Sequence, residues 1–479
     1  MSAVRARWER LDRPERIALA GLAVLLAGGI ALRLLAMLAY RPALIGYYDT
    51  PVYVEGARGE LFWDPLRAAG YSLFLRMAHA LNDSLSFTTI VQHGLGVASA
   101  LLLYAAVRRG GGPPWLGLVP AAVVLLGGDQ VVFEHALLSE SSFTFLVAAA
   151  LWLALSSRDA SPWNLPAATG ALLGLAACVR LAGLTLIPLV VLWLALVPAA
   201  RRRDRLARAA VAAAGSAAVL AGYLVAAHAQ TDRWSFTRHG AYNFYGRVAT
   251  FADCDEFDPP AGTEAMCEDT PPHSRGSPQY YASQGPAVVV FGEPQQGRVL
   301  EGGPEKIARF SRRAALAQPL DWLDASARDF ARYVLPNRFG RPFNTASTRE
   351  YRAALDDAAR THSALGPISS YWSTAGVRRD ASLYPVLTGY QDRTHVEGVP
   401  MALLLLLAAL GPALCRGRER QAALLFGGIG VALLAVPVVT LNYDGRLGVP
   451  AYGPLAAGAA FGALGLGRAV RARLPSSAA

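Results

Sequence analysis

The stretch Ile45-Gly46-Tyr47-Tyr48-Asp49-Thr50-Pro51-Val52-Tyr53 directly follows an apolar run, 17–39, that is long enough to cross a lipid bilayer. Asp49 is therefore an acid at the edge of a membrane segment. Tyrosines and a proline would hold this backbone near the bilayer, where desolvation raises the pKa of a carboxyl group toward values suited to a general base. A solvated loop with interfacial aromatic residues is the competing interpretation.

The composition of the chain is that of an integral membrane protein. Of its 479 residues, 53% are hydrophobic and only 17% are charged, which is too little polar cover for a soluble protein of this size. The formal net charge is +10, but the arginines gather at the ends of apolar runs, where they orient a membrane protein. Nucleic acid is therefore not expected as a partner, and the lipid bilayer is.

Apolar runs of about 20 residues predict ten transmembrane helices. They span 17–39, 87–107, 114–132, 137–156, 164–180, 182–198, 206–228, 398–415, 420–440 and 449–468. The predicted fold class is an all-α polytopic membrane protein with a mixed, loop-rich extracytoplasmic segment. The predicted parts are an N-terminal membrane module (1–228) with its first outer loop (41–86), the extracytoplasmic segment (229–397), and the C-terminal membrane helices (398–479).

Arginine clusters orient the predicted helices. They precede the first helix, follow the second and fourth, separate the sixth from the seventh and the eighth from the ninth, and follow the last. All of them lie on one side of the membrane if both termini are cytoplasmic. This predicts a multi-pass protein of the plasma membrane whose outer side receives 41–86, 229–397 and the turns near 129–136, 181 and 441–448.

Two cysteines lie in the predicted outer segment. Cys254 and Cys267 are close enough to close a short loop, and a disulfide there requires an oxidising compartment. No zinc-like CxxC spacing competes with this interpretation. Cys178 and Cys415 fall in or beside apolar runs and are expected to be buried.

The same outer segment contains a predicted amphipathic helix. Its apolar residues recur three or four positions apart, as in one face of a helix. They are Leu320, Leu323, Ala327, Phe330 and Val334. We expect this helix to lie on the outer membrane surface.

An acidic cluster marks the predicted outer turn between the third and fourth spans, in Asp129–His135 and Ser139-Glu140-Ser141. Acids and a histidine at an apolar hairpin are costly unless they face a polar cavity. A helix cap formed by Asp129 or Ser139 would explain one or two of these residues. It would not explain Glu134, His135 and Glu140 together, so we expect these three to line a substrate cavity.

Two arginines depart from the positive-inside pattern. Arg180 ends the fifth span, and Arg446 lies in Asn442-Tyr443-Asp444-Gly445-Arg446 before the last span. A guanidinium binds phosphate oxygens in bidentate fashion and keeps its charge when partly desolvated. We therefore expect both to bind an anion, whereas Arg33, inside the first span, is expected to snorkel or to pair.

Aromatic residues mixed with Asn and Arg follow the seventh span, in 238–247. Tyr245 and Arg247 would suit sugar stacking and hydroxyl recognition, although an interfacial aromatic belt fits equally well. Tyr48 and Tyr53, beside Asp49, are expected to line the same site. No Gly-rich phosphate loop, HExxH or GxSxG signature appears, which disfavours nucleotide-driven transport and metalloprotease chemistry.

Together these features resemble the GT-C superfamily of lipid-phosphate-dependent glycosyltransferases. The closest resemblance is to the protein-mannosyltransferase and aminoarabinose-transferase branch and to related enzymes of actinobacteria. It rests on an acid in the first outer loop, on the stretch from Pro65 to Leu75 ending in Gly-Tyr-Ser-Leu-Phe-Leu, and on the outer acidic turn. It covers 17–228 and, loosely, the last two spans.

The resemblance implies a catalytic acid at Asp49 and a lipid phosphate held by Arg446 and Arg180. Many members have an acidic pair where this chain has Asp49-Thr50, which weakens the case for a divalent metal, and no cofactor is firmly implied.

The implied activity is inverting transfer of a hexose or pentose from a polyprenyl-phosphate donor. The acceptor would be a hydroxyl of a cell-envelope glycan, lipid or protein on the extracytoplasmic face. A non-catalytic lipid-phosphate carrier, flippase or transporter is the alternative, and a scaffold acting through 229–397 is a third.

Overall fold

The computed structural model describes residues 12–45, 49–64, 66–157, 162–197, 201–237, 239–293, 299–335, 348–349, 352, 365–373 and 376–473. These residues are mostly helical. Two short strands, β1 (Tyr40–Arg41) and β2 (Arg378–Arg379), pair antiparallel with Tyr40 opposite Arg379. This strand pair ties the end of the first helix to a segment more than 300 positions later in the chain.

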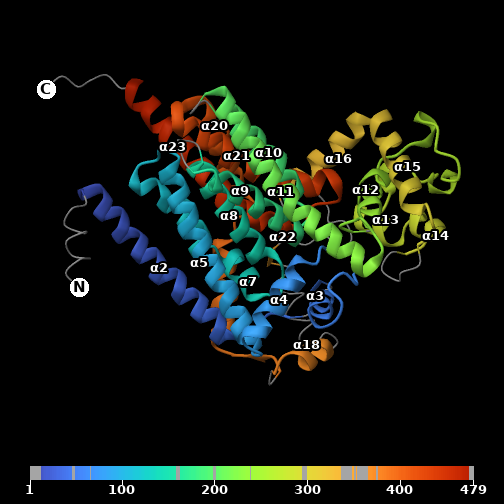
Figure 1. Ribbon diagram of the computed structural model, residues 1–479, viewed down its shortest axis with the longest axis horizontal. Coiled ribbons are helices and arrows are strands. Elements are labelled where there is room, and N and C mark those ends of the chain that lie inside the picture. The colour runs from blue at the N-terminus through green and yellow to red at the C-terminus, as the bar shows by residue number, and fades with distance from the viewer. Residues whose placement is uncertain are drawn as a thin grey trace.

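Each predicted transmembrane segment corresponds to a helix or to part of a bent pair. The helices are α2 (Arg13–Ala39), α5 (Leu85–Arg109), α6 (Leu118–Leu126), α7 (Gly128–His135), α8 (Glu140–Ser156), α9 (Asn164–Val179), α10 (Gly183–Leu196), α11 (Arg202–Thr231), α20 (Val399–Leu414), α21 (Gly417–Thr440) and α23 (Tyr452–Arg473). Within the described residues, five helical segments are long and apolar enough to cross a membrane alone, and two bent pairs pass the same test. The predicted all-α polytopic fold is confirmed (Figure 1).

Small residues bring neighbouring membrane helices into close contact. A side chain at Gly170 of α9 would lie 1.8 Å from the carbonyl oxygen of Ala212 in α11, and the Ser216 hydroxyl donates to the Gly170 carbonyl at 2.8 Å. A side chain at Gly462 of α23 would likewise lie 1.8 Å from the carbonyl oxygen of Leu407 in α20. Such small-residue contacts provide the van der Waals packing that holds helices together in lipid.

The third predicted span is bent, and the outer turn expected near 129–136 is instead mostly the helix α7. Gly127 adopts an extended conformation (φ −64°, ψ 120°) and ends α6, so that α6 and α7 meet at 50°. The polar side chains of α7 find buried partners: Glu134 pairs with Arg33 at 2.8 Å, and Asp129 accepts from Gln391 at 2.9 Å. Because these groups do not need water, the segment remains helical and buried.

The first outer loop folds into α3 (Asp49–Arg58) and α4 (Gly70–Leu81). The Tyr53 and Tyr71 rings join these two helices edge to face, with centroids 4.8 Å apart. A side chain at Gly70 would lie 2.4 Å from the carbonyl oxygen of Cys178. Glycine at position 70 therefore lets the loop pack directly against the end of α9, beside Arg180.

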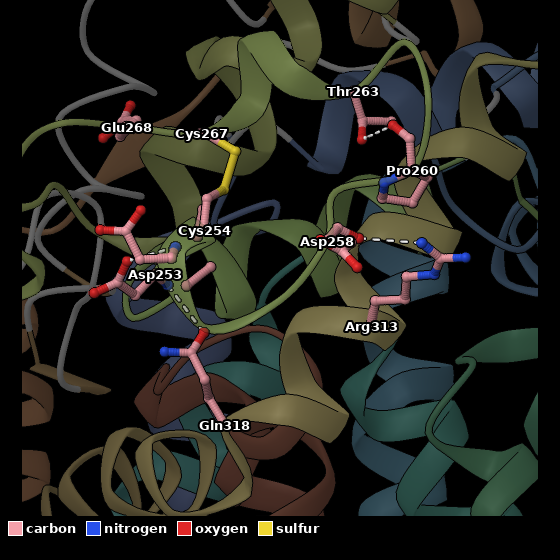
Figure 2. Close-up of a disulfide and its surroundings, with 12 residues drawn as sticks. Asp253, Cys254, Asp258, Pro260, Thr263, Cys267, Glu268, Arg313 and Gln318 are labelled. Carbon is pink, nitrogen blue, oxygen red and sulfur yellow. Dashed lines mark hydrogen bonds between the residues drawn. A yellow bond between two sulfur atoms is a disulfide. The ribbon is translucent and has the colours of Figure 1, made fainter.

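The segment after α11, predicted to be extracytoplasmic, forms a subdomain with its own core, which we call the outer subdomain; it lies at the end of the molecule away from α2 and α23 (Figure 1). Its helices are α12 (Gly240–Ala249), α13 (Pro278–Gln284), α14 (Pro286–Phe291), α15 (Gly303–Ala317) and α16 (Pro319–Ala331). Cys254 and Cys267 are joined in a disulfide with Cα atoms 5.9 Å apart (Figure 2). Cys178 and Cys415 are free and buried.

The predicted amphipathic helix corresponds to α16, but its apolar face is shorter than expected. Leu320 and Leu323 are 77% and 64% exposed, as a helix on a membrane surface requires. Phe330 instead packs against the main core, and Val334 lies beyond the end of the helix. Trp322 anchors α16 to the membrane bundle by donating to the Val439 carbonyl at 3.0 Å.

The end of the predicted extracytoplasmic segment returns to the membrane bundle. It contains α18 (Leu365–Tyr371), β2 and α19 (Leu383–Thr394). The Tyr390 hydroxyl of α19 donates to the Leu126 carbonyl at 2.6 Å, and α19 meets α20 at 43°. The expected segment 229–397 is thus divided between the outer subdomain and the surroundings of α2 and α7.

Candidate functional site

Asp49, the first residue of α3, binds two arginines from distant parts of the chain. Its Oδ1 accepts from Nε and Nη2 of Arg67 at 2.6 and 2.5 Å, and its Oδ2 accepts from Nη1 of Arg446 at 2.5 Å. Asp49 is 8% exposed. The structure therefore brings together the expected base and an expected phosphate-binding arginine, which are 397 positions apart.

Glu140, at the start of α8, links the second expected arginine to this pair. Its Oε1 lies 2.5 Å from Nη1 of Arg180 and 3.2 Å from Nε of Arg446. Glu140 is fully buried. We call Asp49, Arg67, Glu140, Arg180 and Arg446 the central cluster.

The Ser139 hydroxyl extends the central cluster toward an aromatic side chain. It accepts from the Tyr53 hydroxyl at 3.4 Å and from Arg180 at 3.3 Å. It makes no capping hydrogen bond to α8, so the helix-cap alternative does not describe this side chain. Tyr53 thus lies beside the cluster as expected, whereas Tyr48 falls outside the described residues.

The protonation state of Asp49 differs from the expectation. Burial does raise the pKa of this carboxyl group, as predicted, but the adjacent charges of Arg446 and Arg67 outweigh burial and hold the pKa well below its usual range. Asp49 is therefore a carboxylate throughout the physiological pH range.

Glu134 and His135 belong to a different buried network. Glu134 pairs with Arg33 at 2.8 Å and with Nδ1 of His93 at 3.0 Å, while His135 Nε2 lies 2.6 Å from the Tyr40 carbonyl oxygen. Both side chains have no exposed surface. The structure therefore places them among α2, α5 and α7, where they hold helices together. Within the part of the chain that the structure describes, they make no contact with the central cluster.

The Arg33–Glu134 pair yields a stability prediction. Replacing Arg33 by Ala leaves a buried carboxylate without its main cation, and breaking such a pair costs about 3–5 kcal/mol. We expect a large drop in the thermal unfolding midpoint of the purified protein. The exposed Arg109→Ala variant is the matched control and should shift the midpoint little; equal midpoints for the two variants would contradict this account of Arg33.

Tyr245 and Arg247, expected near substrate, lie on α12 in the outer subdomain. Tyr245 is fully buried in the core of that subdomain. Arg247 is 3% exposed in its side chain and pairs with Asp329 of α16. Both residues thus belong to the outer subdomain, and among the described contacts neither reaches the central cluster.

Two residues of this site were not among the predicted site residues. Arg67 binds Asp49 directly, although it follows it by 18 positions. Asp444 caps α22 (Gly445–Gly448): its Oδ1 accepts from the backbone amide of Arg446 at 3.0 Å. The available signal was the same in both cases, an opposite charge in the same predicted outer loop or turn as an expected site residue.

Asp444 has a raised pKa. Removal from bulk water raises the pKa from 3.8 to about 6, and Arg446 only partly opposes this effect. A carboxyl group with a raised pKa binds its proton more tightly in the folded state than in the unfolded chain. Rising pH therefore costs stability between 3.8 and about 6, and that cost persists at higher pH.

Asp444→Asn is expected to stabilise the protein at neutral pH. Asparagine retains the capping oxygen but cannot ionise, so about 1–3 kcal/mol should be regained at pH 7.5. Unfolding midpoints of wild type and variant should converge near pH 4. A constant difference between them across this range would show that ionisation of Asp444 is not the cause.

The central cluster does not fit a divalent metal. Both oxygens of Asp49 bind arginines, and among the described residues no group of three or more His, Cys, Asp or Glu side chains could hold a metal ion. A guanidinium on each oxygen supplies the positive charge that a metal would bring.

No protein-family model matches the chain, and no curated protein matches it. Among solved structures it is similar to the protein O-mannosyltransferase Pmt1-Pmt2 complex of S. cerevisiae bound to the sugar donor. It is also similar to the archaeal oligosaccharyltransferase AglB from Archaeoglobus fulgidus, in complex with an inhibitory peptide and a dolichol-phosphate, and to ArnT from Cupriavidus metallidurans bound to undecaprenyl phosphate. These neighbours are GT-C glycosyltransferases.

The identities to these three are 17%, 12% and 13%, and the TM-scores are 0.37, 0.45 and 0.37. The matches cover 49%, 96% and 94% of this chain and 36%, 52% and 78% of the respective neighbours. The chain thus spans about half the length of AglB and less of the mannosyltransferase.

Proposed function

We propose that the protein is a membrane glycosyltransferase that transfers a sugar from a polyprenyl-phosphate donor to an acceptor hydroxyl, with inversion. The observation that carries the proposal is the direct contact of Asp49 with Arg446. Inverting transfer needs a proton acceptor next to a phosphate-binding cation, because the attacking hydroxyl and the leaving phosphate flank the same anomeric carbon.

The donor phosphate would bind between Arg446 and Arg180. These guanidinium groups share one carboxylate oxygen, Oε1 of Glu140. The donor phosphodiester carries one negative charge, as Glu140 does, but it has two non-bridging oxygens where Glu140 presents only Oε1, so it can engage both arginines at once. The lipid tail would leave the site between the apolar helices.

Donor binding would also activate Asp49. In the ligand-free arrangement Arg446 is bound to Asp49, and its charge helps to keep the carboxyl pKa low. A phosphate that attracts Arg446 weakens this contact and lets burial raise the pKa. Asp49 thus becomes a better base once the donor is in place.

In the proposed reaction the acceptor oxygen forms a bond to the anomeric carbon on the face opposite the phosphate. The bond between that carbon and the phosphate oxygen breaks, and its electron pair leaves with the polyprenyl phosphate. Asp49 takes the hydroxyl proton. Arg446 and Arg180 stabilise the negative charge that grows on the leaving phosphate.

We further propose that the reaction occurs on the extracytoplasmic face of the plasma membrane, with a hexose or pentose as the sugar and a cell-envelope glycan, lipid or protein as the acceptor. The Cys254–Cys267 disulfide supports the outer location of the subdomain, since disulfides persist in oxidising compartments. Arginine clusters at the opposite helix ends support cytoplasmic termini.

The test of this function is the stereochemistry of the product. Purified protein in detergent is incubated with synthetic polyprenyl-phosphate sugars of defined anomeric configuration and an alcohol acceptor, and the product is analysed by NMR. The proposal predicts the opposite anomeric configuration in the product. Retained configuration would contradict a single in-line displacement with Asp49 as base.

A further inference from the structure

A polar pocket lies in the outer subdomain and is lined by residues of α12, α13 and α16. Its volume is about 650 Å³, within the range of small-ligand sites. Four arginines and three aspartates line it. The most buried of these are Arg247, Asp329 and Arg332, with 3%, 7% and 13% of their side chains exposed.

Arg247 and Arg332 share a single carboxylate. Asp329 Oδ2 accepts from Arg247 and, at 3.3 Å, from the backbone amide of Tyr443, while Oδ1 lies 3.2 Å from Nε of Arg332. Nε of Arg247 is buried and has no hydrogen-bond partner among the described residues. Among the residues that the structure describes, two largely buried cations thus pair with one carboxylate, which leaves one positive charge without a counterion.

The other charged residues of the pocket do not supply the missing anion. Arg275 is occupied by backbone carbonyls, including those of Ala249 and Ala252 at 3.0 and 2.7 Å. Arg328 and Asp324 pair with each other at 2.7 Å and are more than half exposed. With Asp321 they form a polar rim whose carboxylates can accept hydrogen bonds from hydroxyl groups.

Burial of Arg332 has an electrostatic consequence. Its pKa lies below the usual range, because burial and the charge of Arg247 act against the contact with Asp329. A guanidinium in this condition gains more from an added oxyanion than an exposed one does. The buried arginines therefore favour an oxyanion, and the pocket has the volume to hold a small ligand that carries one.

We propose that this pocket binds a hydroxyl-rich glycan that carries one oxyanion, a phosphate or a carboxylate, held by Arg247 and Arg332. Resting on the proposed function, we assign this glycan as the sugar acceptor. The hydroxyl groups bind Asp321 and Asp324 at the rim.

The pocket is mechanically connected to the central cluster. Tyr443 donates its amide to Asp329, and the next residue, Asp444, caps the turn that carries Arg446. Tyr443 also donates its hydroxyl to Glu397 at 2.7 Å, which fixes the turn from a second side. A ligand that moves Asp329 or its arginines would therefore also shift the turn that positions Arg446 beside Asp49.

The test is binding of three soluble probes to the full-length protein in nanodiscs of zwitterionic lipid: glucose 6-phosphate, glucuronic acid and glucose, by isothermal titration calorimetry. The two anionic sugars should bind and glucose should bind at least tenfold more weakly. Arg332→Gln should weaken binding of the anionic sugars at least tenfold, and Arg332→Lys should restore part of it. The exposed Arg312→Gln variant, in the same subdomain, should bind like wild type.

Two further variants separate this site from the central cluster. Binding should persist in Arg446→Gln and in Asp49→Asn, whether or not the protein shows transferase activity. Loss of binding in Arg446→Gln with wild-type binding in Arg332→Gln would overturn the pocket assignment. Competition by phosphatidylglycerol added to the nanodisc would overturn the glycan and assign the oxyanion to a lipid headgroup. If glucose bound as tightly as the two anionic sugars, the oxyanion would play no part in binding, and the proposal would be contradicted.

Discussion

Asp49→Asn is expected to lower the turnover of sugar transfer by about 10²–10⁴-fold, the range contributed by a positioned general base. Asparagine has the size of aspartate and can still accept a hydrogen bond from Arg67, so the fold of α3 should persist. It cannot take the proton of the acceptor hydroxyl. The measurement is the initial rate with a synthetic polyprenyl-phosphate sugar, at saturating donor.

Donor affinity should change in the opposite sense in this variant. Loss of the Asp49 charge releases Arg446, so the donor should bind as tightly as in wild type or more tightly. Asp64→Asn is the matched control, because Asp64 also pairs with Arg67, at 3.3 Å, without contacting Arg446. Weakened donor binding with normal turnover in Asp49→Asn would contradict its assignment as the base.

Arg446→Gln is expected to weaken donor binding by about 10–150-fold, since a hydrogen bond to a charged group contributes about 1.5–3 kcal/mol. The substitution removes the cation that contacts both Asp49 and Glu140. Turnover at saturating donor should fall less than affinity, apart from the lost stabilisation of the leaving phosphate. The apparent donor KM and an independent binding measurement report the two effects separately.

Arg67→Gln provides the comparison for Arg446. Arg67 binds the same carboxylate as Arg446 but has no recorded contact with Glu140 among the described residues. Its loss should raise the pKa of Asp49 and leave donor affinity near the wild-type value. An unchanged donor affinity in Arg446→Gln, or an equal loss in both variants, would contradict a specific phosphate site at Arg446.

Several residues of the central cluster could be selected from sequence because charge is expensive at a bilayer. At the end of an apolar run a charge needs a partner or a function. Four members of the cluster lie at predicted outer ends of such runs: Asp49, Glu140, Arg180 and Arg446. Their pairing could not be read from the chain, since it joins segments up to 397 positions apart. For the same reason the low pKa of Asp49 could not be predicted. The local sequence indicates that Asp49 is buried, but only the folded chain places the two arginines beside it.

The membrane helices were predictable because their length is set by the bilayer. Counting runs of about 20 apolar residues located the membrane segments. It could not locate the bend at Gly127, because that bend depends on the backbone conformation of a single residue. From sequence, Glu134 and His135 were expected to line a cavity. In the structure Glu134 pairs with Arg33, and His135 contacts His93, on neighbouring helices. Polar residues within apolar segments can mark interhelical pairs as well as substrate sites, and only the partners distinguish the two.

The most direct test of the central claim is turnover by the purified wild-type protein in detergent, where no second compartment exists and transport yields no signal. A panel of synthetic polyprenyl-phosphate sugars is supplied with an alcohol acceptor, and binding and product are measured in the same samples. The account predicts tight donor binding together with release of polyprenyl phosphate and formation of a glycoside. Tight binding of donors that remain intact would contradict it and identify the protein as a lipid-phosphate carrier.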